Sequence, residues 1–168
     1  MNVFLRIVQH LSTTRGMARR AFPQTTLKAV QAAIGEGELR HRAQLRLIIE
    51  PALPLFELTR RTTARGRAHA LFSRYRIWDT EENCGVLIYI NLAERKVEIV
   101  TDRAVGRAVA RTDWEAACQT MTRGFAAGQF HDSLLAGVSH VNALLATHFP
   151  TAGSSGRANE LADRPVIL

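Results

Sequence analysis

The chain has 168 residues, of which 46% are hydrophobic and 22% are charged, so it is long enough for one domain with its own core. No apolar run reaches the roughly 18 residues that a membrane-spanning helix needs, which excludes such a helix. The formal net charge is +7, nearly all from arginine, and it favours an acidic partner such as phosphate, nucleic acid or a membrane surface; a solvated, arginine-rich surface is the plainer alternative.

The first 21 residues predict an amphipathic, basic helix. Its apolar stripe either packs on the domain's own core, which is the commoner arrangement and the one we expect, or lies on a membrane surface. No secretory signal is recognisable, so we expect a cytoplasmic protein, with a peripheral membrane location as the alternative. The stripe consists of Val3, Phe4, Ile7, Val8 and Leu11, and the nearby arginines are Arg6, Arg15, Arg19 and Arg20.

The next part of the chain predicts a helix, a strand and a second helix. Apolar residues recur at helical spacing from Pro23 to about His41. Residues 44–50 alternate between apolar and polar side chains, as a strand with one buried face requires. Residues 55–74 then predict the second helix.

Two further strands and two helices follow. Residues 86–91 are a strand-forming, mostly apolar run that is typical of a strand covered on both faces, and residues 96–101 predict the third strand. Residues 112–115, Thr-Asp-Trp-Glu, have the pattern of a capping box at a helix start. A final helix is stopped by Pro150, and residues 151–168 predict a mobile tail.

This order of elements predicts an α/β fold: a three-layer α/β/α sandwich around a small mixed sheet. The first two strands and the helix between them form a right-handed β-α-β unit with parallel strands. The third strand returns as an antiparallel hairpin. We therefore expect a basic N-terminal helix over residues 1–21, an α/β domain over residues 22–150, and a tail over residues 151–168.

The predicted topology brings acidic groups from three segments to one rim of the sheet. The first two strands begin at that rim, and the third strand ends there. Gathered carboxylates repel one another unless a cation neutralises them, and Ca²⁺ or Mg²⁺ prefers such oxygen ligands. The predicted metal ligands are Glu38, Asp79, Glu82 and Asp102, with His41 as an acid or base and Arg103 as the phosphate-binding group.

Ordinary structural roles compete with this site. A turn cap, a surface ion pair or a helix-end hydrogen bond would account for each residue singly. The opposite rim carries Glu50 and Asn91 at the carboxyl ends of the parallel strands, where α/β folds usually bind ligands. We expect the acidic rim to hold the site because its polar groups are denser. No motif indicates an organic cofactor, and Cys84 and Cys118 are expected to be free thiols without metal spacing.

The residues from 78 to 105, WDTEENCGVLIYINLAERKVEIVTDRAV, resemble the TPM domain, the thylakoid-lumen phosphatase-like family. The shared pattern is a strand reading G-V-L-I, a short turn, and a second strand reading K-V-E-I-V. Residues 125–138 are similar to the family's F-x-x-G-x-F/Y segment, and residues 27–50 to the leading helix and strand of its short bacterial branch. The resemblance covers residues 22–150.

The resemblance implies an α/β/α sandwich. Some relatives are associated with acid phosphatase activity and bound Ca²⁺, whereas others act in assembly or as membrane accessory proteins. The chain departs from the family pattern at three positions. Cys84 replaces an Asn, Ala104 replaces a Gly, and Gln44 replaces a more usual Glu, which removes one carboxylate near the predicted rim.

Two functions from different classes follow from these observations. The first is a metal-assisted phosphatase that acts on a phosphate-bearing substrate. The second is a non-catalytic binding or accessory module that docks a protein partner or an anionic membrane through its basic helices and N-terminal stripe. Nucleic acid is a weaker third partner, because the arginines come without a recognised nucleic-acid motif.

Overall fold

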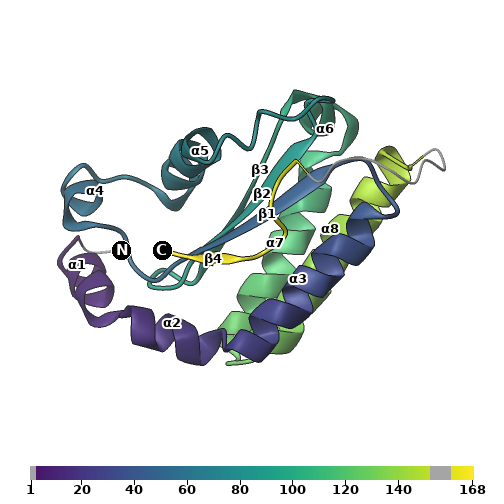
Figure 1. Cartoon of the computed structure of the whole chain (residues 1–168). Coiled ribbons are helices and arrows are strands. Elements are labelled where there is room, and N and C mark those ends of the chain that lie inside the picture. The colour runs from purple at the N-terminus through teal and green to yellow at the C-terminus, as the bar shows by residue number, and fades with distance from the viewer. Residues whose placement is uncertain (1–2, 152–159) are drawn as a thin grey trace.

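The computed structural model describes residues 3–151 and 160–168, and it contains a central four-stranded sheet (Figure 1). The strand order is β3-β2-β1-β4. β1 pairs in parallel with β2 and with β4, and β2 pairs antiparallel with β3, so the predicted mixed sheet is confirmed. The strands are β1 (Gln44–Glu50), β2 (Gly85–Asn91), β3 (Lys96–Thr101) and β4 (Val166–Ile167).

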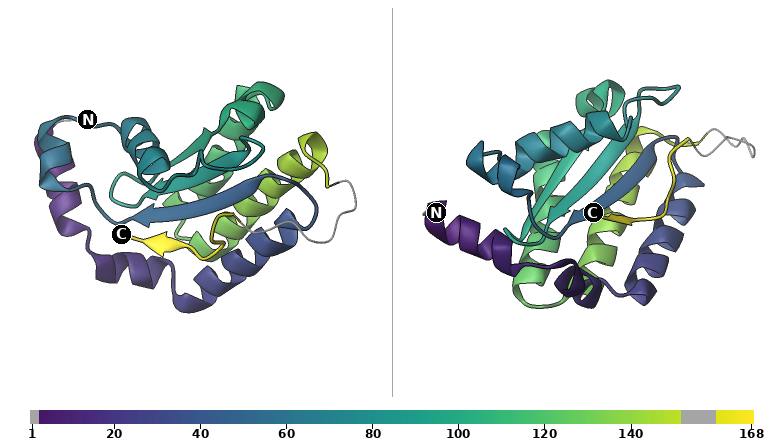
Figure 2. Two further views of the ribbon diagram at one scale, coloured as in Figure 1. Left: turned by 45° about the horizontal axis from the view of Figure 1, so that its top comes forward. Right: turned by 60° about the vertical axis from the view of Figure 1, so that its left-hand side comes forward.

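Three long helices cover one face of the sheet and enclose the main core. They are α3 (Gln24–Glu38), α7 (Arg111–Ala126) and α8 (Phe130–His148), and the two views of Figure 2 show them on the same side. Alternate residues of β1 and β2 point into this layer, as the period of a strand requires. These residues are Leu45, Leu47, Ile49, Val86, Ile88 and Ile90.

The opposite face is covered by α5 (Ala64–Arg74), which makes the third layer (Figure 1). Ile48, Leu87 and Tyr89 point toward it and are fully buried. Every residue of β2 is buried, which confirms that its mostly apolar run belongs to a strand covered on both faces.

Three local predictions differ from the structure. The predicted helix over residues 55–74 is broken into α4 (Leu55–Thr59) and α5, because Arg61 has a positive φ and Thr63 caps the start of α5. The predicted capping box is wrong: α7 begins two residues earlier than a Thr112 cap requires, with Ala110 as its N-cap and no side-chain hydrogen bond there. A short helix that the sequence did not predict, α6 (Arg103–Ala108), follows β3.

The tail also differs from the prediction in the part that is described. Residues 152–159 lie outside the described residues, whereas Val166 and Ile167 pair with β1 as strand β4. Gln44 holds the segment before β4, because its Oε1 accepts hydrogen bonds from the backbone amides of Glu160 and Leu161, at 2.9 and 3.0 Å. The tail is therefore anchored to the sheet at its end.

The single helix predicted over residues 1–21 is instead two helices, α1 (Val3–Ser12) and α2 (Arg15–Ala21), because Thr14 caps the start of α2. They form an arm at the end of the sheet that carries the β2–β3 turn (Figure 1). Glu94 of that turn holds the arm through an ion pair with Arg6 at 2.7 Å and a hydrogen bond from His10 Nε2 at 3.1 Å. The Leu53 amide donates to His10 Nδ1 at 3.0 Å, so the ring proton lies on Nε2. The Glu94 side chain is 1% exposed, so these contacts are well shielded from water.

We predict that Gly85→Ala destabilises the protein by roughly 3 kcal/mol, at the upper end of the cost of overpacking. An added Cβ would lie 1.8 Å from the carbonyl oxygen of Ile77, and a backbone atom cannot yield as a side chain can. The matched control is Gly16→Ala, whose nearest neighbour is 3.6 Å away. Urea denaturation measures both variants, and equal stabilities would contradict the close contact.

A second prediction concerns Glu94. Burial raises the pKa of its carboxyl, but hydrogen bonds from Arg6, Lys96 and His10 outweigh burial and hold the pKa below the ordinary value. The stabilisation is thus complete above the ordinary pKa and is lost as the pH falls through the lowered value. Glu94→Gln should speed hydrogen exchange of the α1 amides about 10- to 100-fold at neutral pH, since tenfold corresponds to about 1.4 kcal/mol.

Acid should release α1 in the unmodified chain in the same way, below the ordinary carboxyl pKa. The control is Glu36→Gln, which removes an exposed carboxylate on α3. If NMR exchange in α1 is the same for Glu94→Gln and the unmodified chain, Glu94 does not hold the arm.

Candidate functional site

The reversal of β3 places Asp102 beside the turn that precedes β2, as the sequence predicts. The Ala104 amide donates to the Asn83 carbonyl at 3.2 Å, and Arg103 Nη2 donates to Asn83 Oδ1 at 3.2 Å. The Asp102 amide also donates to the Gly85 carbonyl at 2.9 Å. Two of the three predicted segments therefore meet at this rim.

The predicted metal ligands do not come together with them. Asp79 is exposed, and Glu82 forms an ion pair with Arg42 at 2.5 Å. Glu38 accepts a hydrogen bond from the Leu45 amide at 2.8 Å. Within residues 3–151 and 160–168, no group of three or more His, Cys, Asp or Glu side chains has a geometry that could hold a metal ion. As a set, these carboxylates do not fit a shared Ca²⁺ or Mg²⁺ site.

Asp102 has one carboxylate oxygen that, among the described residues, is free to bind a ligand. Its Oδ1 accepts a hydrogen bond from the Arg103 amide at 2.6 Å at the N-terminus of α6. Its Oδ2 is buried and has no hydrogen-bond partner within the described part of the chain. A buried carboxylate oxygen without a partner is costly, so this atom is the strongest remaining sign of a ligand at the rim.

His41 lies inside the protein and not at an open rim. Its side chain is buried, and its ring nitrogens lie 3.1 Å from Ala43 O and 3.1 Å from Asn142 Oδ1. Asn142 Nδ2 donates to the Ala33 carbonyl at 2.8 Å, so the group links α3, β1 and α8. Burial lowers the pKa of His41, although the bonds to Asn142 and Ala43 oppose the shift. The catalytic role of His41 stays a prediction, and these contacts give it a structural role.

The carboxyl group of Glu38 also has a shifted pKa. Burial raises its pKa to about 7, against the opposing hydrogen bond from the Leu45 amide and with a further contribution from Asp163. The Leu45 amide is a backbone partner inside the fold, so this contact gives Glu38 a structural role.

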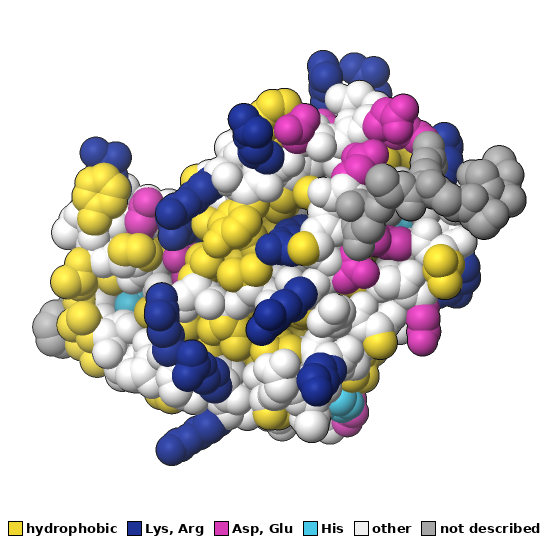
Figure 3. Space-filling view, viewed as in Figure 1, with side chains coloured by type: hydrophobic (Ala, Val, Ile, Leu, Met, Phe, Trp, Pro, Cys, Tyr) yellow, Lys and Arg dark blue, Asp and Glu magenta, His cyan; other side chains and the backbone are white. Residues whose placement is uncertain are grey.

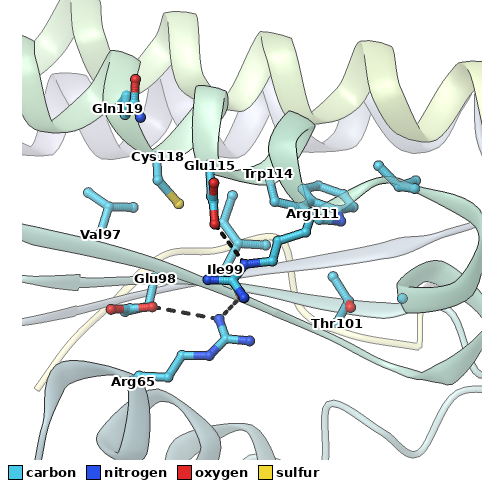
Figure 4. Close-up of a pocket in the computed structure, with 12 residues that line it drawn as sticks. Arg65, Val97, Glu98, Ile99, Thr101, Arg111, Trp114, Glu115, Cys118 and Gln119 are labelled. Atoms are coloured by element: carbon cyan, nitrogen blue, oxygen red, sulfur yellow. Dashed lines mark hydrogen bonds and ion pairs between the residues drawn. The ribbon is translucent and has the colours of Figure 1, made fainter.

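A cavity of about 700 Å³ lies between β3, α5 and the start of α7 (Figure 4). Its charged side chains are paired with one another: Arg65 lies 3.6 Å from Glu98, and Arg111 lies 2.7 Å from Glu115. Burial raises the pKa of the Cys118 thiol to about 11, so this thiol is protonated and is a poor nucleophile at neutral pH. The cavity thus carries neither an unpaired charge nor a reactive group.

The most unusual surface lies on α1 and α4. Because Arg6 and His10 face Glu94, the opposite side of α1 faces outward, and Leu5 and Leu11 are 60% and 62% exposed. The sequence predicted that this stripe packs on the core, which is wrong for Val8 and Leu11; the side chains of Val3 and Phe4 lie outside the described residues. We call this surface the apolar ridge, and it consists of Leu5, Val8, Leu11, Leu55 and Phe56.

The apolar ridge follows the left edge of the molecule in Figure 3. Two arginines follow α4 directly, and the guanidinium of Arg60 lies 4.1 Å from the centre of the Phe56 ring. Arg61 and Arg60 are both exposed, so positive charge borders the apolar side chains. Across the described ranges, the helices are all too short or too polar to cross a bilayer.

Comparison with known proteins identifies a similar solved structure and a matching family. Among solved structures, the chain is similar to the BA42 protein of the psychrophilic bacterium Bizionia argentinensis, an NMR structure. The match has a TM-score of 0.73 at 22% sequence identity and covers 85% of this chain and 92% of that chain. No match was found among curated proteins.

The family comparison agrees with the resemblance in the central strands. The model described as the TPM domain matches residues 19–144, which include all three long helices of the main layer in whole or in large part. This range is well over half of the chain. The chain therefore belongs to the TPM domain family.

Proposed function

We propose that this TPM domain is a non-catalytic docking module that attaches to anionic membrane surfaces through the apolar ridge. The observation that carries the proposal is the orientation of α1. Amphipathic helices of globular proteins normally turn their apolar side to the core, whereas α1 is held by its polar side. Its leucines face water together with Leu55 and Phe56 of α4.

Exposed apolar side chains that are contiguous and bordered by cations suit an interfacial membrane site. Burying one leucine or phenylalanine side chain fully contributes about 1.5–3 kcal/mol, and insertion into the headgroup region recovers a part of this. An arginine near an anionic surface contributes about 1 kcal/mol. Arg60 and Arg61 stand at the border of the ridge, and the whole chain has a net charge of +7.

A second copy of the chain or another protein could also cover the ridge. An anionic membrane is favoured over a second copy because two copies would bring the same positive border and the same net charge together. The positive border gains nothing from a neutral apolar partner. Charge complementarity therefore favours an anionic partner, and the exposed apolar side chains beside the charge favour a membrane surface.

We predict that the double substitution Leu5→Ser/Leu11→Ser abolishes flotation with vesicles of phosphatidylcholine and phosphatidylserine. Both side chains are exposed, so the fold should persist, and a circular dichroism melt checks this. Binding of the unmodified chain should weaken strongly in vesicles of phosphatidylcholine alone and at high salt, because exposed charges are screened.

The matched control is Leu39→Ser, which replaces another highly exposed leucine at the end of α3. It should float as the unmodified chain does. Equal flotation of the ridge variant and the control would refute membrane docking through the ridge. A dimer in solution that the ridge variant dissociates, with no vesicle binding, would assign the surface to a second copy and would also refute the proposal.

A metal-assisted phosphatase acting on phosphate esters is the second candidate function. The observation that favours it is the buried, unpartnered Oδ2 of Asp102, beside Arg103 and Asn83. The other predicted ligands do not gather there, so we derive no catalytic step through a metal ion. Family resemblance adds a reason to test the activity but does not assign it.

The test of this candidate is a titration of Ca²⁺ or Mg²⁺ followed by the melting temperature. An ion that binds only the folded state must raise the stability, by about 2.7 kcal/mol at a hundred times its Kd. Asp102→Asn should remove that rise together with hydrolysis of p-nitrophenyl phosphate, whereas Asp132→Asn, an exposed carboxylate of α8, should change neither. A melting temperature that neither ion moves would eliminate the second candidate and leave membrane docking untouched.

A further inference from the structure

A cavity of about 360 Å³ opens at the carboxyl ends of the parallel strands β1 and β4. It lies between the junction of α1 and α2, the loop after β1, and α5. In Figure 3 the middle of the drawn face shows an apolar floor with Lys and Arg side chains around it. Its lining includes three arginines and three largely apolar side chains: Arg15, Arg67, Arg74, Leu71, Tyr75 and Pro54.

The inner end of the cavity is a buried, fully bonded polar group. Arg67 donates from Nη2 to Glu50 Oε1 at 2.6 Å and from Nε to Glu50 Oε2 at 3.0 Å. Tyr89 Oη donates to Glu50 Oε2 at 2.6 Å. The carboxylate of Glu50 is therefore neutralised by Arg67 and is not free to repel an anion. The group also fixes Arg67 rigidly in the wall.

Two other arginines in the cavity have no such partner. Arg15 and Arg74 are exposed, and neither has an ion pair or a side-chain hydrogen bond within residues 3–151 and 160–168. The lining side chains include three guanidinium groups and the Glu50 carboxylate, and Leu168, which also lines the cavity, adds a backbone carboxylate. Arg67 is balanced by Glu50 and by Glu57 at 3.3 Å, so the cations open to an anion from solvent are the exposed Arg15 and Arg74.

We propose that this cavity binds the phosphate group of a small organic phosphate monoester. Guanidinium groups recognise phosphate oxygens through paired hydrogen bonds, and a dianionic monoester matches two unpaired arginines better than a carboxylate does. The organic part would rest on Leu71, Tyr75 and Pro54, which are apolar lining residues. The volume lies in the range of small-molecule sites, and the carboxyl ends of parallel strands are their usual position in α/β folds.

This inference does not rest on the proposed function. None of the residues of the apolar ridge lines the cavity, and the cavity is remote in sequence from Asp102. The two proposals can therefore fail separately. The phosphate monoester could be a free metabolite or the headgroup of a phosphatidic acid, and both present the same chemistry to Arg15 and Arg74.

The test is an NMR titration of the full chain with glycerol 3-phosphate at constant ionic strength. The amide signals of Leu71, Arg74 and Tyr75 should shift and saturate. Arg15→Gln/Arg74→Gln should weaken binding at least tenfold, with an otherwise unchanged spectrum. The matched control is Arg107→Gln/Arg123→Gln, which removes the same charge from exposed positions on α6 and α7 and should leave the affinity unchanged.

A second titration with soluble dihexanoyl phosphatidic acid separates the two sources. Binding at least tenfold tighter than that of glycerol 3-phosphate would identify a lipid headgroup, and similar affinities would identify a free metabolite; both results support the proposal. Absence of saturable shifts with either compound would overturn it. An equal loss of affinity in the control variant would also overturn it, because binding would then depend on net charge alone.

Discussion

The burial of β2 on both faces is the constraint on which the rest of this fold depends. All of its residues are inaccessible to water, so its edges must be paired and both of its faces covered. Leu87 and Tyr89 require α5 on one side, and Val86 and Ile88 require the three long helices on the other. Gly85 lets the chain enter this strand directly against the carbonyl of Ile77, where no side chain would fit.

Buried carboxylates then decide which surfaces remain free. Glu94 selects the polar side of α1, and the apolar side is left facing water as a consequence. Glu50 binds Arg67 at the carboxyl end of β1 and leaves Arg15 and Arg74 as the unpaired cations of the cavity there. In both places an adjacent arginine offsets the cost of burying the carboxylate. The groups that do not take part in these ion pairs, apolar side chains on α1 and arginines at the cavity, then form the neighbouring surface.

The carboxylates of the acidic rim do not act together in this way. Two of its carboxylates have ordinary partners, since Glu82 bonds Arg42 and Glu38 bonds the Leu45 amide, and Asp79 is exposed. Asp102 alone keeps a buried oxygen without one. The buried oxygen of Asp102 is thus the feature of this rim that its contacts within the described residues do not explain.

The sequence by itself determined the three main strands, the three long helices, the mixed sheet and the family, because strand period, helix period and the G-V-L-I and K-V-E-I-V strands are local signals. It also placed Asp102 beside Asn83, since a hairpin leaves no other arrangement. Only the tertiary structure decided that the last residues pair with β1 and that Leu5, Val8 and Leu11 of α1 face outward. These outcomes depend on Gln44, which binds amides 116 and 117 residues away, and on Glu94, which binds His10 across 84 residues. Hydrophobic periodicity identifies the two sides of a helix, but a distant buried charge settles which side is turned inward.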